Sequence, residues 1–145
     1  MTTRISKNFT LEELCASATA KAKGISNNPG QTDIVNLCAL THKVLQPLRD
    51  WWGKEVKIGS GYRSYALNKA VGGVSNSQHM KGEAVDLCID GDMVKGRSWF
   101  QYIRQHCQFD QLIWEHNAKG SYWVHVSYRA DGNNRKQVIN DLLKK

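Results

Sequence analysis

The segment Ser77–Asp86 (SQHMKGEAVD) places a histidine, His79, and an aspartate, Asp86, seven residues apart. A second histidine, His125, lies inside the segment Tyr122–Tyr128, whose aromatic and β-branched residues predict a strand. Two imidazoles and one carboxylate are the ligand set of a zinc site with an open fourth position, where a water can be activated. A fold that uses this set must bring distant parts of the chain together, and hydrolysis is then the leading hypothesis.

The expected strands allow such a meeting. Asp86 lies in the apolar segment Ala84–Ile89, and side chains alternate along a strand, so Asp86 and His125 can share one sheet face if their strands are neighbours. Gly82 lets the backbone turn back tightly, which would bring His79 to the same point. The competing interpretation is structural, because a single strand histidine is usually a hydrogen-bonded residue and such an aspartate is usually a turn or cap. A buried imidazole and carboxylate need polar partners, which favours the metal site.

The N-terminal part of the chain predicts helices. Thr10 and Glu13 form a capping box that opens a short helix, with Ala18 on its apolar side. Apolar residues at helical spacing predict a longer helix over residues 33–51. Pro47 is expected to kink or end that helix near its last turn.

The second half of the chain predicts mainly strands. One further helix is expected over residues 93–106, with Asp92 as its cap. The strands are expected at residues 56–58, 84–89, 111–115 and 122–128, with the last two paired as a hairpin and a tail from residue 135 that fits strand or helix. We therefore expect an α+β domain, with N-terminal helices packed on a small, mainly antiparallel sheet. One domain would span residues 1–145, with a helical part at about 9–52 and a metal-site sheet at about 55–139.

The composition narrows the classes of partner. Hydrophobic residues make up 41% of the chain, and no apolar run approaches the roughly 18 residues of a membrane span. The N-terminus lacks the apolar region of a secretory signal, so we expect synthesis in the cytoplasm without a signal peptide. The net charge of +7 attracts polyanions, but the basic residues are scattered and no nucleic-acid motif is present. We expect no specific nucleic-acid partner; an anionic cell envelope suits this charge at least as well.

The motifs resemble those of the zinc D-Ala-D-Ala carboxypeptidase family. Ser77–Asp86 matches the family's SxHxxGxAxD signature, which is highly specific. Ser60–Ser64, followed by Leu67–Asn68, is similar to the family's SGYRS…LN segment, and Trp123–Ser127 is similar to its closing histidine strand. The resemblance extends over about residues 9–139, includes the N-terminal part of the family's phage and bacterial members, and suggests a single-domain member of phage or prophage type.

This resemblance carries expectations for the site and its substrate. It implies that His79, Asp86 and His125 are zinc ligands, and that the fold is the one shared with lysostaphin-type peptidases and the hedgehog signalling domain. It implies that Arg63 binds a substrate carboxylate or stabilises the oxyanion, although a surface salt bridge is the alternative for this residue. The implied substrate is the stem peptide of bacterial peptidoglycan. We expect a monomer that reaches the cell wall after release by a holin or as a virion component.

The sequence indicates the general base less directly than it indicates the metal ligands. Many carboxypeptidase members carry an acid three residues before the last histidine, where this chain has Tyr122. Glu115 ends the preceding strand, across the expected hairpin from the His125 strand, and hedgehog-like domains place a glutamate similarly after an aromatic residue. We expect Glu115 to be the base, with Asp110 and Glu83 as weaker candidates. The alternative for Glu115 is a solvated hairpin carboxylate.

Three further side chains are candidates for substrate binding, namely Ser77, His116 and Trp123. Their structural alternatives are a residue that shapes the loop, a solvated loop histidine and a sheet-packing aromatic. Together these features favour a zinc peptidase of peptidoglycan stem peptides, acting as a D,D-carboxypeptidase or as an endopeptidase of endolysin type. The alternative function is a non-catalytic zinc module that binds a wall peptide or a protein partner. Tyr122 favours this alternative and Glu115 opposes it.

Overall fold

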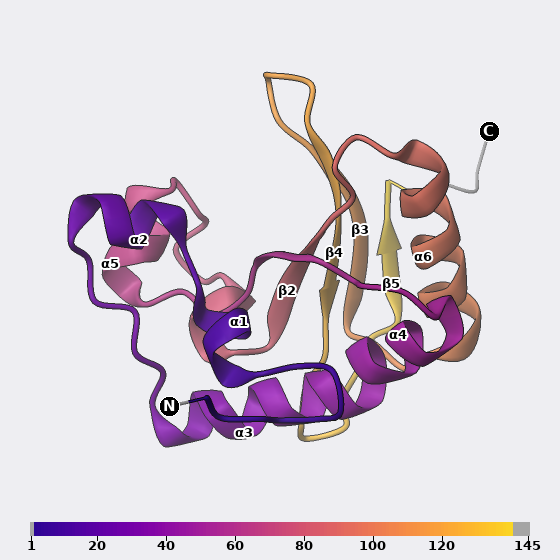
Figure 1. Ribbon diagram of the computed structural model, residues 1–145, viewed down its shortest axis with the longest axis horizontal. Coiled ribbons are helices and arrows are strands. Elements are labelled where there is room, and N and C mark those ends of the chain that lie inside the picture. Colours follow the sequence, from indigo (N-terminus) through magenta and orange to yellow (C-terminus); the bar gives the residue numbers. More distant parts are fainter. Residues whose placement is uncertain (1, 141–145) are drawn as a thin grey trace.

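The computed structural model describes residues 2–140, and a five-stranded sheet lies at its centre (Figure 1). The strands are β1 (Ile58–Ser60), β2 (Ala84–Cys88), β3 (Gln111–His116), β4 (Tyr122–Ser127) and β5 (Gln137–Ile139). Their order in the sheet is β1-β2-β4-β3-β5. All neighbours are antiparallel except β3 and β5, which are parallel. This mixed sheet with its helices confirms the expected α+β class.

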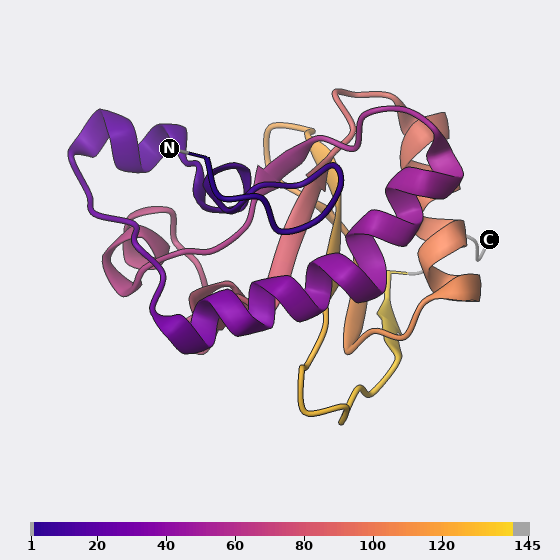
Figure 2. The same cartoon turned by 60° about the horizontal axis from the view of Figure 1, so that its bottom comes forward.

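The helices precede and interrupt the strands. They are α1 (Leu11–Cys15), α2 (Ala18–Lys23), α3 (Gln31–Leu40), the π-helical turn η1 (Thr41–Leu45), α4 (Gln46–Trp52), α5 (Tyr65–Ala70), the 3₁₀ turn η2 (Gln78–Lys81) and α6 (Met93–His106). The α3–η1–α4 segment and α6 cover the same face of the sheet (Figures 1 and 2). Within residues 2–140, no helix is both long enough and apolar enough to cross a membrane.

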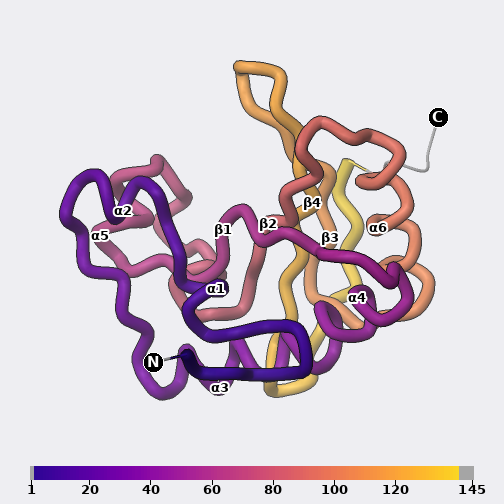
Figure 3. Tube along the Cα trace, in the orientation of Figure 1, coloured from indigo at the N-terminus to yellow at the C-terminus, as the bar shows by residue number. Residues whose placement is uncertain are grey.

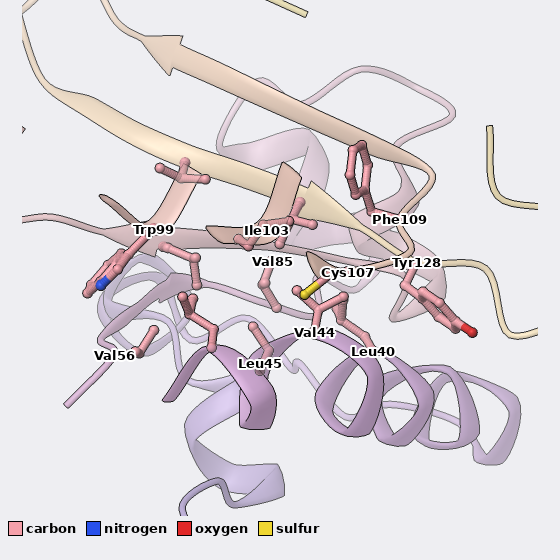
Figure 4. Packing of buried hydrophobic residues seen from close by; sticks show 14 of the residues in the cluster. Leu40, Val44, Leu45, Val56, Val85, Trp99, Ile103, Cys107, Phe109 and Tyr128 are labelled. Atoms are coloured by element: carbon pink, nitrogen blue, oxygen red, sulfur yellow. The ribbon is translucent and has the colours of Figure 1, made fainter. Parts of the chain in front are cut away.

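The apolar core fills the space between this sheet face and its helices (Figure 4). Alternate residues of the two central strands face the core and are fully buried, namely Val85, Leu87, Val124 and Val126. The helices meet them with the buried side chains of Leu40, Val44, Leu45, Trp99 and Ile103. Each such side chain contributes about 1.5–3 kcal/mol on burial. Because the core uses only one set of alternate residues, the other face of the sheet is free to carry polar groups.

Pro47 does not end the long N-terminal helix, which continues to Trp52. The helix passes through the π turn η1, in which the backbone N–H of Gln46 donates to the carbonyl of Thr41, five residues back. Pro47 then lies in the first turn of α4, where a missing backbone N–H costs least. The wider turn thus admits the proline without breaking the helix.

The first helix is shorter than expected. Thr10 does cap α1, since its side chain accepts the N–H of Glu13, but the helix ends at Cys15. Ala18 instead begins α2, because Ser17 supplies a new N-terminal cap. The hydroxyl of a serine at this position favours a fresh start over continuation of the helix.

Three other expectations for the second half of the chain are confirmed. Asp92 caps α6, accepting the N–H of Lys95. β3 and β4 form the expected antiparallel hairpin, whose tip extends beyond the other strands (Figures 1 and 3). The ambiguous tail contributes a strand, β5, at the edge of the sheet beside β3.

Gly82 fixes the position of η2 against the helical layer. It ends η2 in the left-handed conformation with φ 72°, and a Cβ at this position would overlap the carbonyl oxygen of Asp33 in α3. Gly120, in the hairpin loop, also has a positive φ of 84°, but it has open space around it. Gly82 therefore combines a strained backbone conformation with close packing, whereas Gly120 has the strained conformation alone.

We expect Gly82→Ala to lower the free energy of unfolding by roughly 2–4 kcal/mol, because it combines left-handed strain with a clash against α3. Gly120→Ala should lose only the strain, roughly 1–2 kcal/mol. Urea unfolding of both variants measures the difference. Equal losses would show that the contact between Gly82 and α3 contributes nothing.

Candidate metal centre

The polar face of the sheet brings two of the expected ligands together. In the β2–β4 register, Asp86 lies directly opposite His125, and on the other side His125 is the partner of Ile113 in β3. Side-chain alternation places all three on the face opposite the helices. Both Asp86 and His125 are buried there.

His79 reaches the same point from η2. The turn is fixed at its start by the hydroxyl of Ser77, which accepts the His79 N–H at 3.2 Å, and at its end by Gly82. The ring Nδ1 lies 2.7 Å from the carbonyl oxygen of Gly61, which can only accept, so Nδ1 carries the proton. His79 therefore turns its Nε2 toward the cluster, 3.4 Å from Oδ1 of Asp86.

His79 faces the cluster with Nε2, whereas His125 faces it with Nδ1. Its Nδ1 lies 2.9 Å from Oδ1 of Asp86 and 3.3 Å from Oε1 of Glu115. One ligand atom from each of His79, Asp86 and His125 lies within 4.8 Å of the others. Two imidazole nitrogens and one carboxylate oxygen are a donor set that suits zinc, with a fourth position left for a reactant. The Gly61 carbonyl that orients His79 is the kind of outer partner that metal-binding histidines have.

Asp86 is kept ionised in this buried place. Burial raises the pKa of its carboxyl, but hydrogen bonds from His125 and His79 outweigh that effect and hold the pKa well below its usual range. Arg63 adds a cation, with Nη2 at 3.4 Å from Oδ2 of Asp86. A charged carboxylate is the form in which an aspartate binds a metal.

Arg63 is locked beside the cluster. Its Nε donates to the hydroxyl of Ser60 at 3.2 Å, its Nη1 donates to Oδ1 of Asn68 at 3.1 Å, and its backbone N–H donates to the carbonyl of His79. Only 15% of the side chain is exposed. The structure therefore places Arg63 in the site rather than in a surface salt bridge.

Asn68 and Gly73 hold Arg63 in that position, and the sequence did not single out their role. Asn68 is buried on α5, and its Nδ2 donates to the carbonyl of Val74 at 2.9 Å. A Cβ on Gly73 would overlap Oδ1 of Asn68 and lie 2.9 Å from Nη1 of Arg63. The lack of a side chain at Gly73 thus allows its loop to approach Asn68 and Arg63 closely.

A cleft of about 590 Å³ opens over the cluster. Glu115 and Trp123, partners in the β3–β4 register, line it toward the hairpin tip. Ser77 also lines the cleft, beside His79. Arg135, from the segment that leads into β5, lines it as well.

Glu115 is the base candidate that the structure places in the cleft. Its side chain is 36% exposed and lies beside His125. Asp110 is buried and is hydrogen-bonded to Arg135. Glu83 is not among the cleft-lining residues, and its Oε1 lies 3.4 Å from Nε2 of Gln78. Among the lining residues of the described chain, Glu115 and Asp86 are the two carboxylates.

His116 lies outside the cleft. Alternation along β3 turns its side chain to the opposite face from Glu115. Its ring contacts that of Tyr122 at 5.3 Å between centroids, and Tyr122 in turn stacks on Trp114 at 5.4 Å. The structure thus separates His116 and Tyr122 from the metal ligands.

An ion pair between the exposed Arg135 and the buried Asp110 connects the wall of the cleft near β5 to the turn that carries His79. The carboxylate of Asp110 accepts hydrogen bonds from Nε and Nη2 of Arg135 at 2.9 and 2.8 Å. It also accepts one from the backbone N–H of Arg135. Gln78, the residue before His79, donates its Nε2 to the same carboxylate at 3.1 Å. Hydrogen bonding from the Arg135 side chain lowers the pKa of Asp110 to about 2. No local sequence pattern predicts this pair, because its two residues lie 25 apart in the chain.

The stability that Asp110 supplies should depend on pH. Its pKa is about 2 in the folded protein and about 4 in the unfolded chain, so the contribution is complete above pH 4 and is lost as the pH falls toward 2. We expect Asp110→Asn to lower the free energy of unfolding by about 2 kcal/mol at pH 7 and by much less at pH 2.5. Chemical unfolding across this range measures it, with the exposed Asp131→Asn as a control of much smaller effect. A loss that is independent of pH would contradict the assignment.

Comparison with known proteins bears on the same residues. The model of the peptidase M15 family matches residues 7–127, a range that includes His79, Asp86 and His125. The zinc D-Ala-D-Ala carboxypeptidase of Streptomyces albus G is 48% identical to this chain over 44 residues. The aligned part covers 30% of this chain and 17% of that relative, so the chain matches less than a fifth of the relative's length.

Proposed function

Because the chain belongs to the peptidase M15 family, we propose that it is a zinc-dependent peptidase that hydrolyses peptide bonds in the stem peptides of bacterial peptidoglycan. The observation that carries the proposal is the buried His79–Asp86–His125 cluster, which opens into a cleft beside Glu115. The Streptomyces relative, a zinc D-Ala-D-Ala carboxypeptidase, supports both the metal and the substrate class.

Each member of the cluster has one atom suited to the metal. His79 would bind zinc through Nε2, His125 through Nδ1 and Asp86 through its carboxylate. In this structure Nδ1 of His125 donates to Asp86, so metal binding releases that proton. When bound, zinc supplies a Lewis acid that polarises the scissile carbonyl and lowers the pKa of a water.

Glu115 is proposed to move the proton. It lies in the cleft beside His125, where it can accept a proton from the attacking water and pass it to the leaving amine. Arg63, fixed by Asn68 and Ser60, supports the negative charge of the tetrahedral oxyanion or of a substrate carboxylate. Arg63 is held before substrate arrives, which lowers the cost of ordering it.

The remaining expected residues divide into two groups. Ser77 and Trp123 line the cleft and are proposed to contact the substrate. His116 lies on the opposite face and has no part in the proposal.

The position of Tyr122 weakens the case for a non-catalytic binding module. Its side chain stacks on Trp114, on the face of the sheet away from His125. In this register an acid at position 122 would point away from the metal ligands, so its lack removes no proton acceptor from the cleft.

The position of the bond that is cut decides between two types of peptidase. Removal of a terminal D-Ala would make the protein a D,D-carboxypeptidase, and cleavage within the stem would make it an endopeptidase of endolysin type. Mass spectrometry of the released fragments distinguishes the two. A phage or prophage origin and delivery to the wall depend on the sequence resemblance alone and stay predictions.

Metal removal tests the first half of the proposal. We expect the purified chain to bind zinc and to reduce the turbidity of isolated cell walls, and we expect a chelator to abolish this activity until zinc is restored. Asp86→Ala should lose both zinc and activity, because it removes a ligand. A chain that binds no zinc would refute the proposal, and zinc binding without lysis or peptide release would favour the binding module.

Replacement of the base tests the second half. Glu115→Gln keeps the shape of the side chain, so we expect full zinc content and a rate reduced by roughly 10²–10⁴. Glu55→Gln, an exposed carboxylate outside the cleft lining, is the matched control and should keep the wild-type rate. An unchanged rate for Glu115→Gln would assign the proton transfer to another group.

A further inference from the structure

The cleft contains a second arginine that the proposed chemistry does not use. Arg135 lines the cleft, and 56% of its side chain is exposed. Its partner Asp110 has only 1% of its side chain exposed. The pair therefore presents its cationic member to the cleft and keeps its anionic member in the protein.

Arg135 is held in one orientation. Nε and Nη2 are bound to the two oxygens of Asp110, which is itself fixed by Gln78 and by the backbone N–H of Arg135. A guanidinium has five N–H groups. The two on Nη1 and the second on Nη2 have no acceptor among the described residues. They form a fork of donors whose geometry suits a carboxylate, and little side-chain entropy remains to be lost on binding.

The cleft runs along β3, so positions along this strand show how far Arg135 lies from the reacting groups. Gln111, Ile113 and Glu115 alternate along this strand and all line the cleft. Ile113 marks the level of the metal ligands, because it is the register partner of His125. With a rise of about 3.3 Å per residue, Gln111 and the adjacent Asp110 lie roughly 7–10 Å from that level. Arg135 is bonded to Asp110, so it sits roughly two to three residues of extended peptide from the scissile bond.

The two arginines of the cleft therefore act at different places. Arg63 is mostly buried against Asp86, beside the reacting groups. Arg135 stands at the end of the strand away from Glu115, where the neighbouring Gln111 is neutral and donates its Nε2 to Gln137. The carboxylate at this end, Asp110, is already neutralised. Among the described residues, a ligand anion here would meet donors and no competing acid.

We propose that Arg135 forms a carboxylate subsite, which selects peptides that carry a free acidic group two to three residues from the scissile bond. The inference rests on the proposed function and deepens it, since it names the class of peptide that the cleft prefers. Because Arg135 is half exposed and already paired, the preference is moderate, about tenfold.

Two synthetic peptides test this subsite. One is a stem pentapeptide with a free D-glutamate carboxylate, and the other is the same peptide with that carboxylate amidated. We expect wild-type protein to show a kcat/KM about tenfold higher for the acid, mainly through a lower KM. Arg135→Gln should reduce this ratio to about one, and Arg135→Lys, which keeps the charge but not the fork, should retain part of it.

The ratio is taken within each protein, so a partly unfolded variant does not distort it. Arg129→Gln is the matched control, because Arg129 is a partly exposed arginine paired with Asp131 and lies outside the cleft lining. Its ratio should equal that of the wild type. A wild-type ratio of one would overturn the subsite, and so would an Arg135→Gln variant that slows both peptides equally.

Calorimetric titration of the same two peptides into each zinc-loaded protein separates this inference from the proposed function. If wild-type protein cleaves neither peptide, the proposed function fails. The subsite then stands if wild-type protein binds the acid more tightly than the amide and Arg135→Gln does not. Equal binding of both peptides by the wild type overturns it.

Discussion

The pairing of β2 with β4 is the interaction on which the rest of the structure depends. It sets Asp86 opposite His125, and the same register sets Val85 opposite Val126 on the other face. One set of hydrogen bonds thus fixes both the metal ligands and the centre of the core. A slip of one residue would turn the carboxylate into the apolar layer, where an unpaired charge is strongly unfavourable. The requirements of folding and of the site therefore select the same register.

Much of this arrangement was predictable because its signals are local or periodic. Capping by Thr10 and Asp92, the alternation around His125 and the turn at Gly82 each depend on a few adjacent residues. The α+β class and the approach of the two strands followed from these signals. The π turn before Pro47 was not predictable, since an extra residue in a helical turn leaves no mark in the apolar pattern. Side-chain contacts made across loops were equally hidden, as in the Arg135–Asp110 pair and in Asn68 and Gly73 beside Arg63.

The positive charge of the chain is not concentrated in the cleft. The net charge is +7, yet the two arginines of the cleft, Arg63 and Arg135, are each paired with a buried aspartate. Each pair holds its guanidinium at a fixed point, and its two opposite charges largely cancel at a distance. The arginines therefore direct hydrogen bonds within the cleft and contribute little to long-range electrostatic attraction. The scattered surface charge can still draw the protein toward a polyanion. Recognition within the cleft and long-range attraction thus depend on different residues.

The three candidate metal ligands come from separate elements, η2, β2 and β4, and His125 lies 39 residues from Asp86 in the sequence. An ion bound to all three would act as a removable cross-link between them, and the unfolded chain offers it no such site. By mass action, free metal at 100 times its dissociation constant would add about 2.7 kcal/mol to the stability of the fold. The melting temperature would then report the occupancy of the site, even without substrate. In an environment poor in metal, the same protein would be easier to unfold and degrade.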